Sequence, residues 1–145
     1  MTSQLCTFAD VRISLPNGWV NVSDDMPEGT PPTLAKSEGV GALQFSVGRY
    51  RSGANPQVSP DDLDALFKDF ADARSLSTAA DVERGKSASH YVGGSFLHGD
   101  DLIRAWYLTN GCDVALVTYV VVATSGDAAV ELAEAGTIVR SIDFG

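Results

Sequence analysis

The fold is decided by the stretch VALVTYVVVA, residues 114–123, which is the longest apolar run in the chain. Successive side chains of a β-strand point to opposite faces of a sheet, and both faces of this strand are apolar. One face carries Val114, Leu116, Val120 and Val122, and the other carries Ala115, Val117, Tyr119 and Val121. This pattern is typical of a central strand that is covered on both sides. The run is also too short to span a bilayer, so we expect no membrane segment.

Two turn signals precede this strand and predict that it belongs to an antiparallel meander. His98-Gly99-Asp100-Asp101 suits a two-residue hairpin with glycine first, and Asn110-Gly111 is the strongest short hairpin signal. The two turns together fix the pairing of the strand between them. They place Trp106 between Gly93 and Ala115, and Arg104 between Ser95 and Val117.

A helix begins clearly at Ser59, which is a favourable N-cap residue followed by Pro60 at the first helical position. The apolar residues that follow recur at helical spacing and form one stripe. They are Leu63, Leu66, Phe67 and Phe70. This stripe is expected to anchor the helix on one face of the sheet.

A second helix is predicted over residues 127–139, because one helix cannot cover a strand that is apolar on both faces. The residues expected to face the sheet are Ala129, Leu132, Ala133 and Gly136. A short segment, Ile142 to Phe144, then closes the chain.

The N-terminal half supplies further one-sided strands. Residues 9–15 alternate between apolar and polar, and Pro16-Asn17-Gly18 ends that strand with turn chemistry. Shorter strands are expected at residues 33–37 and 43–47. The sequence therefore predicts one α+β domain over residues 1–145, an α/β/α sandwich with a mainly antiparallel sheet of about six strands and helices on both faces.

Several segments of this plan resemble the PsbP-like family. They are Leu15-Pro16-Asn17-Gly18-Trp19, the strand through Phe45, the helix start at Ser59-Pro60, Arg104-Ala105-Trp106-Tyr107 and Ile138-Val139-Arg140-Ser141-Ile142. The resemblance covers most of the chain and consists of packing and turn motifs. It implies an α/β/α sandwich that acts by binding proteins, as do an extrinsic photosystem subunit, a Ran-binding import factor and bacterial toxin chaperones. The chain differs from the envelope lipoproteins of the family because it has no lipoprotein signal.

Composition and charge narrow the classes of partner. The chain has 19 acidic and 10 basic residues and a net charge of −9, which repels nucleic acid and anionic lipid and favours encounter with a basic protein. Solubility is the simpler explanation of the same charge. The two cysteines, Cys6 and Cys112, fit no motif and are expected to be free thiols. No secretory signal is recognised, so a cytoplasmic location is predicted, with the chain a monomer or a homodimer.

No catalytic or metal-binding constellation is recognised. His90 and His98 fall on one predicted strand, about 26 Å apart at the usual rise, which is too far for a shared metal ion. Cys112 follows a hairpin turn and has no activating context for a nucleophile. Gly39-Val40-Gly41 lacks the spacing of a phosphate-binding loop. We therefore expect neither a cofactor nor an enzyme.

Three groups of residues are candidates for partner binding. Arg49, Tyr50 and Arg51 close a strand and combine basic and aromatic character, although an ordinary strand end is the simpler interpretation. The proline-stiffened loop after Trp19 carries acidic residues that a partner could contact, or is a solvated connector. These are Asp24, Asp25 and Glu28. Arg104 and Trp106 would form an anchor if exposed, and otherwise belong to the core.

The leading hypothesis is a non-catalytic protein-binding module, such as an immunity protein or an adaptor or chaperone for a secreted toxin system. The alternative is a small-molecule-binding protein or an unrecognised enzyme with a pocket between sheet and helix. A deep, enclosed cavity with convergent polar groups would favour the alternative.

Overall fold

The computed structural model describes residues 3–50 and 53–145 of the chain. Within these residues it contains nine strands, two α-helices and one short 3-10 helix, η1. The elements are β1 (Ser3–Phe8), β2 (Val11–Pro16), β3 (Trp19–Asn21), η1 (Ser23–Asp25), β4 (Thr33–Lys36), β5 (Gly41–Gly48), α1 (Pro60–Ala73), β6 (Ala80–Lys86), β7 (His90–His98), β8 (Asp101–Thr109), β9 (Val114–Val122) and α2 (Ala128–Arg140). No helix in this part of the chain is long and apolar enough to cross a membrane.

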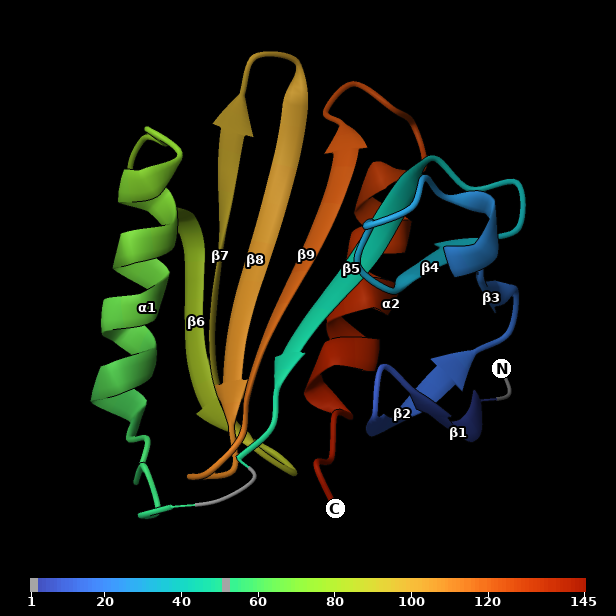
Figure 1. Ribbon diagram of the computed structural model, residues 1–145. Coiled ribbons are helices and arrows are strands. Elements are labelled where there is room, and N and C mark those ends of the chain that lie inside the picture. The colour runs from blue at the N-terminus through green and yellow to red at the C-terminus, as the bar shows by residue number, and fades with distance from the viewer. Residues whose placement is uncertain (1–2, 51–52) are drawn as a thin grey trace.

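The strands form two sheets, which Figure 1 shows with the large sheet in the centre. The large sheet has the order β3-β4-β5-β9-β8-β7-β6, and each pair of neighbouring strands is antiparallel. The α+β class and the antiparallel sheet are confirmed. The prediction of about six strands is too low, since this sheet has seven. The additional strands, β3 and β6, are edge strands. β3 has only three residues and β6 is mostly exposed, so neither shows the apolar alternation that marks a buried strand.

The second sheet is a hairpin of β1 and β2. The strand predicted from residue 9 begins instead at Val11, because Ala9 and Asp10 have positive φ angles of 53° and 69° and form the turn of this hairpin. The turn predicted after β2 is confirmed, with Gly18 at a φ of 91°. β1 was not predicted, because its six residues do not alternate cleanly.

The meander from β7 to β9 has one predicted register and one corrected register. His98 pairs with Asp101, so the predicted two-residue loop at Gly99 is confirmed, and Trp106 lies opposite Gly93. On the other side Trp106 lies opposite Val117, and not Ala115. Arg104 likewise lies opposite Tyr119, and not Val117.

The corrected register results from a longer loop between β8 and β9. The side-chain oxygen of Asn110 accepts hydrogen bonds from the backbone N–H groups of Cys112 and Asp113, at 3.0 and 2.8 Å. Thr109 therefore pairs with Val114, and the loop has four residues in place of two. A shift of two residues keeps every side chain on its predicted face, because the period of a strand is two.

The prediction for α1 is confirmed both at the N-terminus of the helix and along its apolar stripe. The Ser59 hydroxyl accepts a hydrogen bond from Asp62 N–H at 3.2 Å, and the Asp62 carboxylate accepts one from Ser59 N–H at 2.8 Å. Leu63, Phe67 and Phe70 are buried. Burial of each such side chain contributes about 1.5–3 kcal/mol. They pack with Val92, Phe96 and Ala105 of β7 and β8.

The buried side of α2 agrees in part with the predicted one. Gly136 is buried and Leu132 packs partly buried against the core, as predicted, whereas Ala129 and Ala133 are exposed. The buried side also includes Ala135, Ile138 and Val139, and Glu131, which is only 2% exposed. Hydrophobic spacing does not reveal an inward glutamate, so the predicted face is displaced from the buried one.

Glu131 is a buried carboxylate that accepts three hydrogen bonds. Its carboxylate accepts hydrogen bonds from Val40 N–H at 2.7 Å, Gly41 N–H at 3.1 Å and the Tyr119 hydroxyl at 2.9 Å. A Cβ at Gly41 would lie 2.5 Å from the Tyr119 oxygen, so glycine is required at this position. The turn at residues 39–41 therefore binds the buried carboxylate of Glu131, and this contact fixes α2 to β5 and β9.

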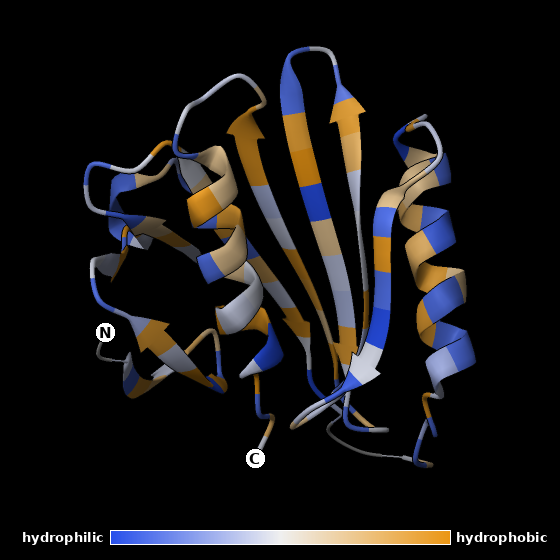
Figure 2. Ribbon diagram, turned by 180° about the vertical axis from the view of Figure 1, so that it is seen from behind, coloured by the Kyte–Doolittle hydropathy of each residue, from blue (hydrophilic) through white to orange (hydrophobic). Residues whose placement is uncertain are grey.

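Neighbouring residues of the central strands pack into different clusters. Ala105 of β8 packs with the α1 stripe, whereas Trp106 and Leu108 belong to the cluster that contains Ile138 and Val139 of α2. The two helices therefore pack against alternate residues of the same strands. Figure 2 shows α2 in front of the sheet when the molecule is seen from behind.

Candidate partner-binding surface

The side of β5 and β9 that faces away from α2 is an uncovered surface, which we call the open face. α2 packs against the other side of these strands, with Leu43, Phe45, Val117 and Tyr119. In Figure 1 no helix lies in front of β9 and β5, while α2 passes behind them. The residues of the open face are Ala42, Gln44 and Ser46 of β5 and Leu116, Thr118, Val120 and Val122 of β9. Leu116 lies at its border and packs in part against the cluster formed by α1.

The open face contains no charged side chain. Its residues form cross-strand pairs, of which Ala42–Val120 and Gln44–Thr118 are the central ones. Val120 and Val122 are 38% and 47% exposed. Charged residues make up 20% of the chain, and these seven residues of β5 and β9 include none. Ser46, Val120 and Val122 are exposed and the other four are partly buried. The charged Asp101 of β8 borders this face, where it pairs with Val122. The expectation that β9 is covered on both sides is wrong at this end, because α1 contacts β7 and β8 but leaves Val120 and Val122 uncovered.

The predicted acidic loop borders the open face at β4. Ser23 Oγ accepts a hydrogen bond from Thr33 N–H at 2.9 Å, which fixes η1 to β4. Thr33 pairs with Gln44 of the open face and is fully buried. Asp24, Asp25 and Glu28 are exposed on this segment. The loop therefore places three carboxylates beside an uncharged surface.

Tyr107 marks the opposite border, where α1 meets the open face. It pairs with Leu116 across β8 and β9, and its ring contacts Phe70 edge-on at 6.4 Å. Burial raises the pKa of the Tyr107 hydroxyl; the positive charge of Arg74 opposes this rise and the negative charge of Asp69 adds to it. The exposed Asp69 of α1 therefore lies close to this border of the open face.

Arg104 and Trp106 lie together on the α2 side of the sheet, away from the open face. Arg104 donates to the Asp81 carbonyl at 2.8 Å and to Ser95 Oγ at 3.0 Å, and its guanidinium lies 3.4 Å from Glu83. Trp106 Nε1 donates to the same Glu83 oxygen at 3.2 Å. Arg104 and Trp106 are 7% and 1% exposed, so both residues are buried.

Arg49 and Tyr50 lie beside the loop that follows β8, around the buried carboxylate of Asp113. Tyr50 N–H donates to Asp113 at 2.6 Å, and the Arg49 guanidinium forms ion pairs with Asp113 at 3.4 Å and Asp10 at 3.7 Å. Arg49 thus links two hairpins, and Tyr50 is 38% exposed. Arg51, the third residue of this predicted group, lies outside the described residues. The structure does not bring Arg49 or Tyr50 to the acidic loop.

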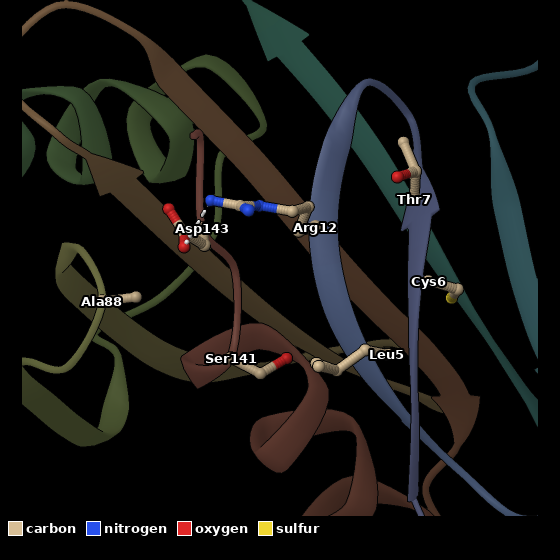
Figure 3. A pocket seen from close by; sticks show the side chains of 7 residues that line it. All are labelled: Leu5, Cys6, Thr7, Arg12, Ala88, Ser141 and Asp143. Carbon is tan, nitrogen blue, oxygen red and sulfur yellow. Dashed lines mark hydrogen bonds and ion pairs between the residues drawn. The ribbon is translucent and has the colours of Figure 1, made fainter.

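A pocket opens between the β1–β2 hairpin and the end of the chain, as Figure 3 shows. Its volume is about 340 Å³. It is lined by Leu5, Cys6, Thr7, Arg12, Ala88, Ser141 and Asp143. Arg12 and Asp143 form an ion pair at 3.0 Å across it. This pocket was not predicted, because the sequence pattern does not predict β1.

Comparisons with known proteins identify the fold. A solved structure of cyanobacterial PsbP (CyanoP) from Synechocystis sp. PCC 6803 superposes with a TM-score of 0.58 at 17% identity, over 97% of this chain and 91% of that chain. The chain has the PsbP-like fold. The Ran-binding protein Mog1p from Saccharomyces cerevisiae and a mutant of Mog1 each match with a TM-score of 0.57 at 8% identity, over 99% of this chain and 96% of theirs. No family model and no curated protein matches the sequence.

Within this PsbP-like fold the histidines and cysteines are dispersed. His90 and His98 begin and end β7, and Cys6 and Cys112 are free thiols. Among residues 3–50 and 53–145 no group of three or more metal-ligating side chains occurs. The sequence does not reveal the open face, because β9 is apolar on both sides and therefore predicts a covered strand. The signal that could have found it is that a helix of fourteen residues with a single apolar stripe covers only the nearest strands.

Proposed function

We propose that this chain is a non-catalytic protein-binding module. It is a single domain over residues 1–145, built as an α/β/α sandwich with helices on both faces. Its open face binds a basic protein. The observation that carries the proposal is the absence of charge on the seven described residues of that face, in a chain with a net charge of −9.

The pattern of the open face is that of a protein interface. Interfaces exclude charged residues from their centre and keep polar residues at the rim. Here the uncharged residues of β5 and β9 form the centre, and Asp24, Asp25 and Glu28 lie at one rim. Rim carboxylates speed the encounter with a basic partner and make it dependent on salt. The acidic loop predicted to bind a partner has this role in the proposal.

The known partner of a structural neighbour is consistent with this function. Mog1p is described as a Ran-binding protein, so this fold carries protein binding in at least one case. The narrower roles of an immunity protein, or of an adaptor or chaperone for a toxin, and the cytoplasmic location stay predictions. Arg49, Tyr50, Arg104 and Trp106 contribute to the proposal indirectly, by holding the hairpins and the sheet in place.

A small-molecule site is the alternative, and one pocket between α2 and β6–β8 bears on it. It contains Glu83, Arg104 and Arg140, which are convergent polar groups. Its volume is about 240 Å³, and a second pocket between α1 and β6–β7, which contains Asp64, Arg84 and His90, has a volume of about 420 Å³. Both pockets are open to solvent, whereas ligand pockets in proteins enclose most of the surface of the ligand. We therefore favour the protein-binding function.

The test compares two lysine substitutions that add the same charge. The wild-type chain, Val120→Lys and Val130→Lys are immobilised and exposed to lysate of the source organism, and bound proteins are released with increasing salt. Val120 lies on the open face and Val130 is an exposed residue of α2, 57% accessible. We expect one basic protein to be retained by the wild type and Val130→Lys and lost from Val120→Lys. Retention of no protein, or equal retention by all three chains, would contradict the proposal.

A further inference from the structure

The free strand edges of the molecule are protected unequally. Edge strands offer unpaired N–H and C=O groups to other chains, and proteins protect them with charges, bulges or short strands. β3 has three residues, and β6 has a bulge between Ala80 and Glu83 and four charged side chains. β1 has six residues, SQLCTF, with no charge and no proline. Within the described chain, β1 is the long edge without protection.

The hairpin turn determines which groups of β1 face outward. Positive φ angles at Ala9 and Asp10 are the signature of a type I′ loop, and the residues that flank such a loop form a hydrogen-bonded pair. That pair is Phe8 and Val11. Because hydrogen-bonded and non-bonded pairs alternate, the backbone groups of Ser3, Leu5 and Thr7 point away from β2. The side chain of Leu5 is 82% exposed.

We propose that β1 pairs antiparallel with β1 of a second copy of this chain. Around a two-fold axis at Leu5, each Leu5 lies opposite its counterpart, and Ser3 lies opposite Thr7. Two leucines and two pairs of hydroxyl residues are favourable cross-strand neighbours, and no like charges meet. The two hairpins become one four-stranded sheet. This contact is independent of the open face and goes beyond the function proposed above.

The second leucine meets Leu5 on the side of β1 that faces away from β2. Residues directly opposite in an antiparallel pair project from the same side of a sheet, so the two leucines pack side by side. In Figure 3 Leu5 points toward Ser141, on the side of β2 where the C-terminal segment lies. The nearby charges, Arg12 and Asp143, are paired with each other at 3.0 Å, so they leave the contact at Leu5 without an unpaired charge.

Charge and size set the strength of this contact. Two copies with a net charge of −9 repel one another everywhere except at neutral surfaces such as β1. Six residues a side is far fewer than the roughly 20–30 of a stable interface. We therefore expect a weak dimer, with a dissociation constant of roughly 10 µM to 1 mM. Salt should strengthen it, because screening reduces the repulsion between the copies.

Sedimentation equilibrium over a range of protein and salt concentrations tests this pairing. We expect the wild type to dimerise reversibly and to do so more tightly in high salt. Leu5→Lys protects the edge and should weaken the dimer by about tenfold or more. Val130→Lys adds the same charge on α2 and should leave the dimer unchanged. Thr7→Pro removes one outward N–H and should also abolish it, whereas Thr7→Val, which keeps the N–H, should not.

A wild-type chain that remains monomeric at about 1 mM in high salt would overturn the pairing. So would a dimer that persists in both Leu5→Lys and Thr7→Pro, with circular dichroism showing that both variants are folded. These outcomes are separate from the fate of the proposed function. Binding of a basic partner weakens with salt and depends on Val120, whereas the dimer strengthens with salt and depends on Leu5.

Discussion

The two sides of the β5–β9 pair differ in whether charged side chains lie on them. On the side covered by α2, the carboxylate of Glu131 is buried and accepts three hydrogen bonds. On the open face the seven residues of β5 and β9 include no charged side chain. The buried charge lies where donors satisfy it, and the side of the two strands that faces away from α2 is uncharged. The proposed function accounts for this arrangement, since interfaces exclude charged residues from their centre.

Removal of the Glu131 carboxylate should have the largest effect on the free energy of unfolding. In Glu131→Ala two backbone N–H groups and the Tyr119 hydroxyl lose their acceptor within the core. We expect the free energy of unfolding to fall by about 3 kcal/mol, since unsatisfied buried donors cost about 1–3 kcal/mol each and relax in part. Urea denaturation measures the change. Val130→Ala on the exposed side of α2 is the control, and an equal loss in both variants would contradict the role of Glu131.

Tyr119 should show a smaller effect and a characteristic pH dependence. Burial, and next the hydrogen bond to Glu131, raise the pKa of the Tyr119 hydroxyl above its ordinary value of 10.0. The unfolded chain therefore releases this proton first, and the stability that the neutral hydroxyl provides is present below pH 10 and lost above it. Tyr119→Phe should cost about 1 kcal/mol at neutral pH.

Urea denaturation between pH 8 and pH 11 separates this contribution from others, at the pH values about the ordinary pKa of tyrosine. The wild type should lose more stability above pH 10 than Tyr119→Phe. The remaining pH dependence comes in part from Tyr107, whose pKa burial also raises. Parallel curves for the two chains would show that Tyr119 does not couple to folding.

Substitution on the open face should change stability less than substitution beneath α2. Val120 is 38% exposed, and Val120→Lys should reduce the free energy of unfolding by less than about 1 kcal/mol. Its effect should instead appear as loss of the captured partner. A variant that unfolds would contradict the description of this face as a surface.

The smallest effect is expected at Glu134, a partly buried glutamate on the same helix as Glu131. Hydrogen bonding from Trp19, at 2.9 Å, lowers the pKa of the Glu134 carboxyl; partial burial opposes this, and Lys36 adds to it. A lowered pKa contributes stability that is present above the ordinary value of 4.5 and is lost as the pH falls below it. Solvent screening reduces the contribution to a few tenths of a kcal/mol.

Urea denaturation of Glu134→Gln and the wild type between pH 3 and pH 7 checks this. The difference between the chains should be small at pH 7 and vanish at the acid end. A loss as large as that of Glu131→Ala would remove the distinction between the two glutamates.

Local signals were enough to predict the elements that local chemistry determines. The cap at Ser59, the loop at Gly99 and the apolar stripe of α1 all depend on residues within a few positions of one another. The register of β9 was missed because Asn110 bonds to its own loop, which lengthens the turn without changing the Asn-Gly signal.

The features that bear on function depend on contacts between distant residues. Glu131 is stabilised by a turn ninety positions away in the chain, and no helical pattern reveals that partnership. The open face depends on how far α1 extends across the sheet, which spacing along the helix does not determine. For the same reason the predicted pair of Arg104 and Trp106 could be recognised in the sequence, while its burial could not.

The central claim is that the open face is covered when the partner binds. Methyl NMR of the chain with and without the captured basic protein tests it most directly, with Val120 and Val122 as reporters and Val130 as reference. We predict that the methyl signals of Val120 and Val122 shift in the complex and that those of Val130 do not. A complex that forms while Val120 and Val122 keep their free-state signals would contradict this account.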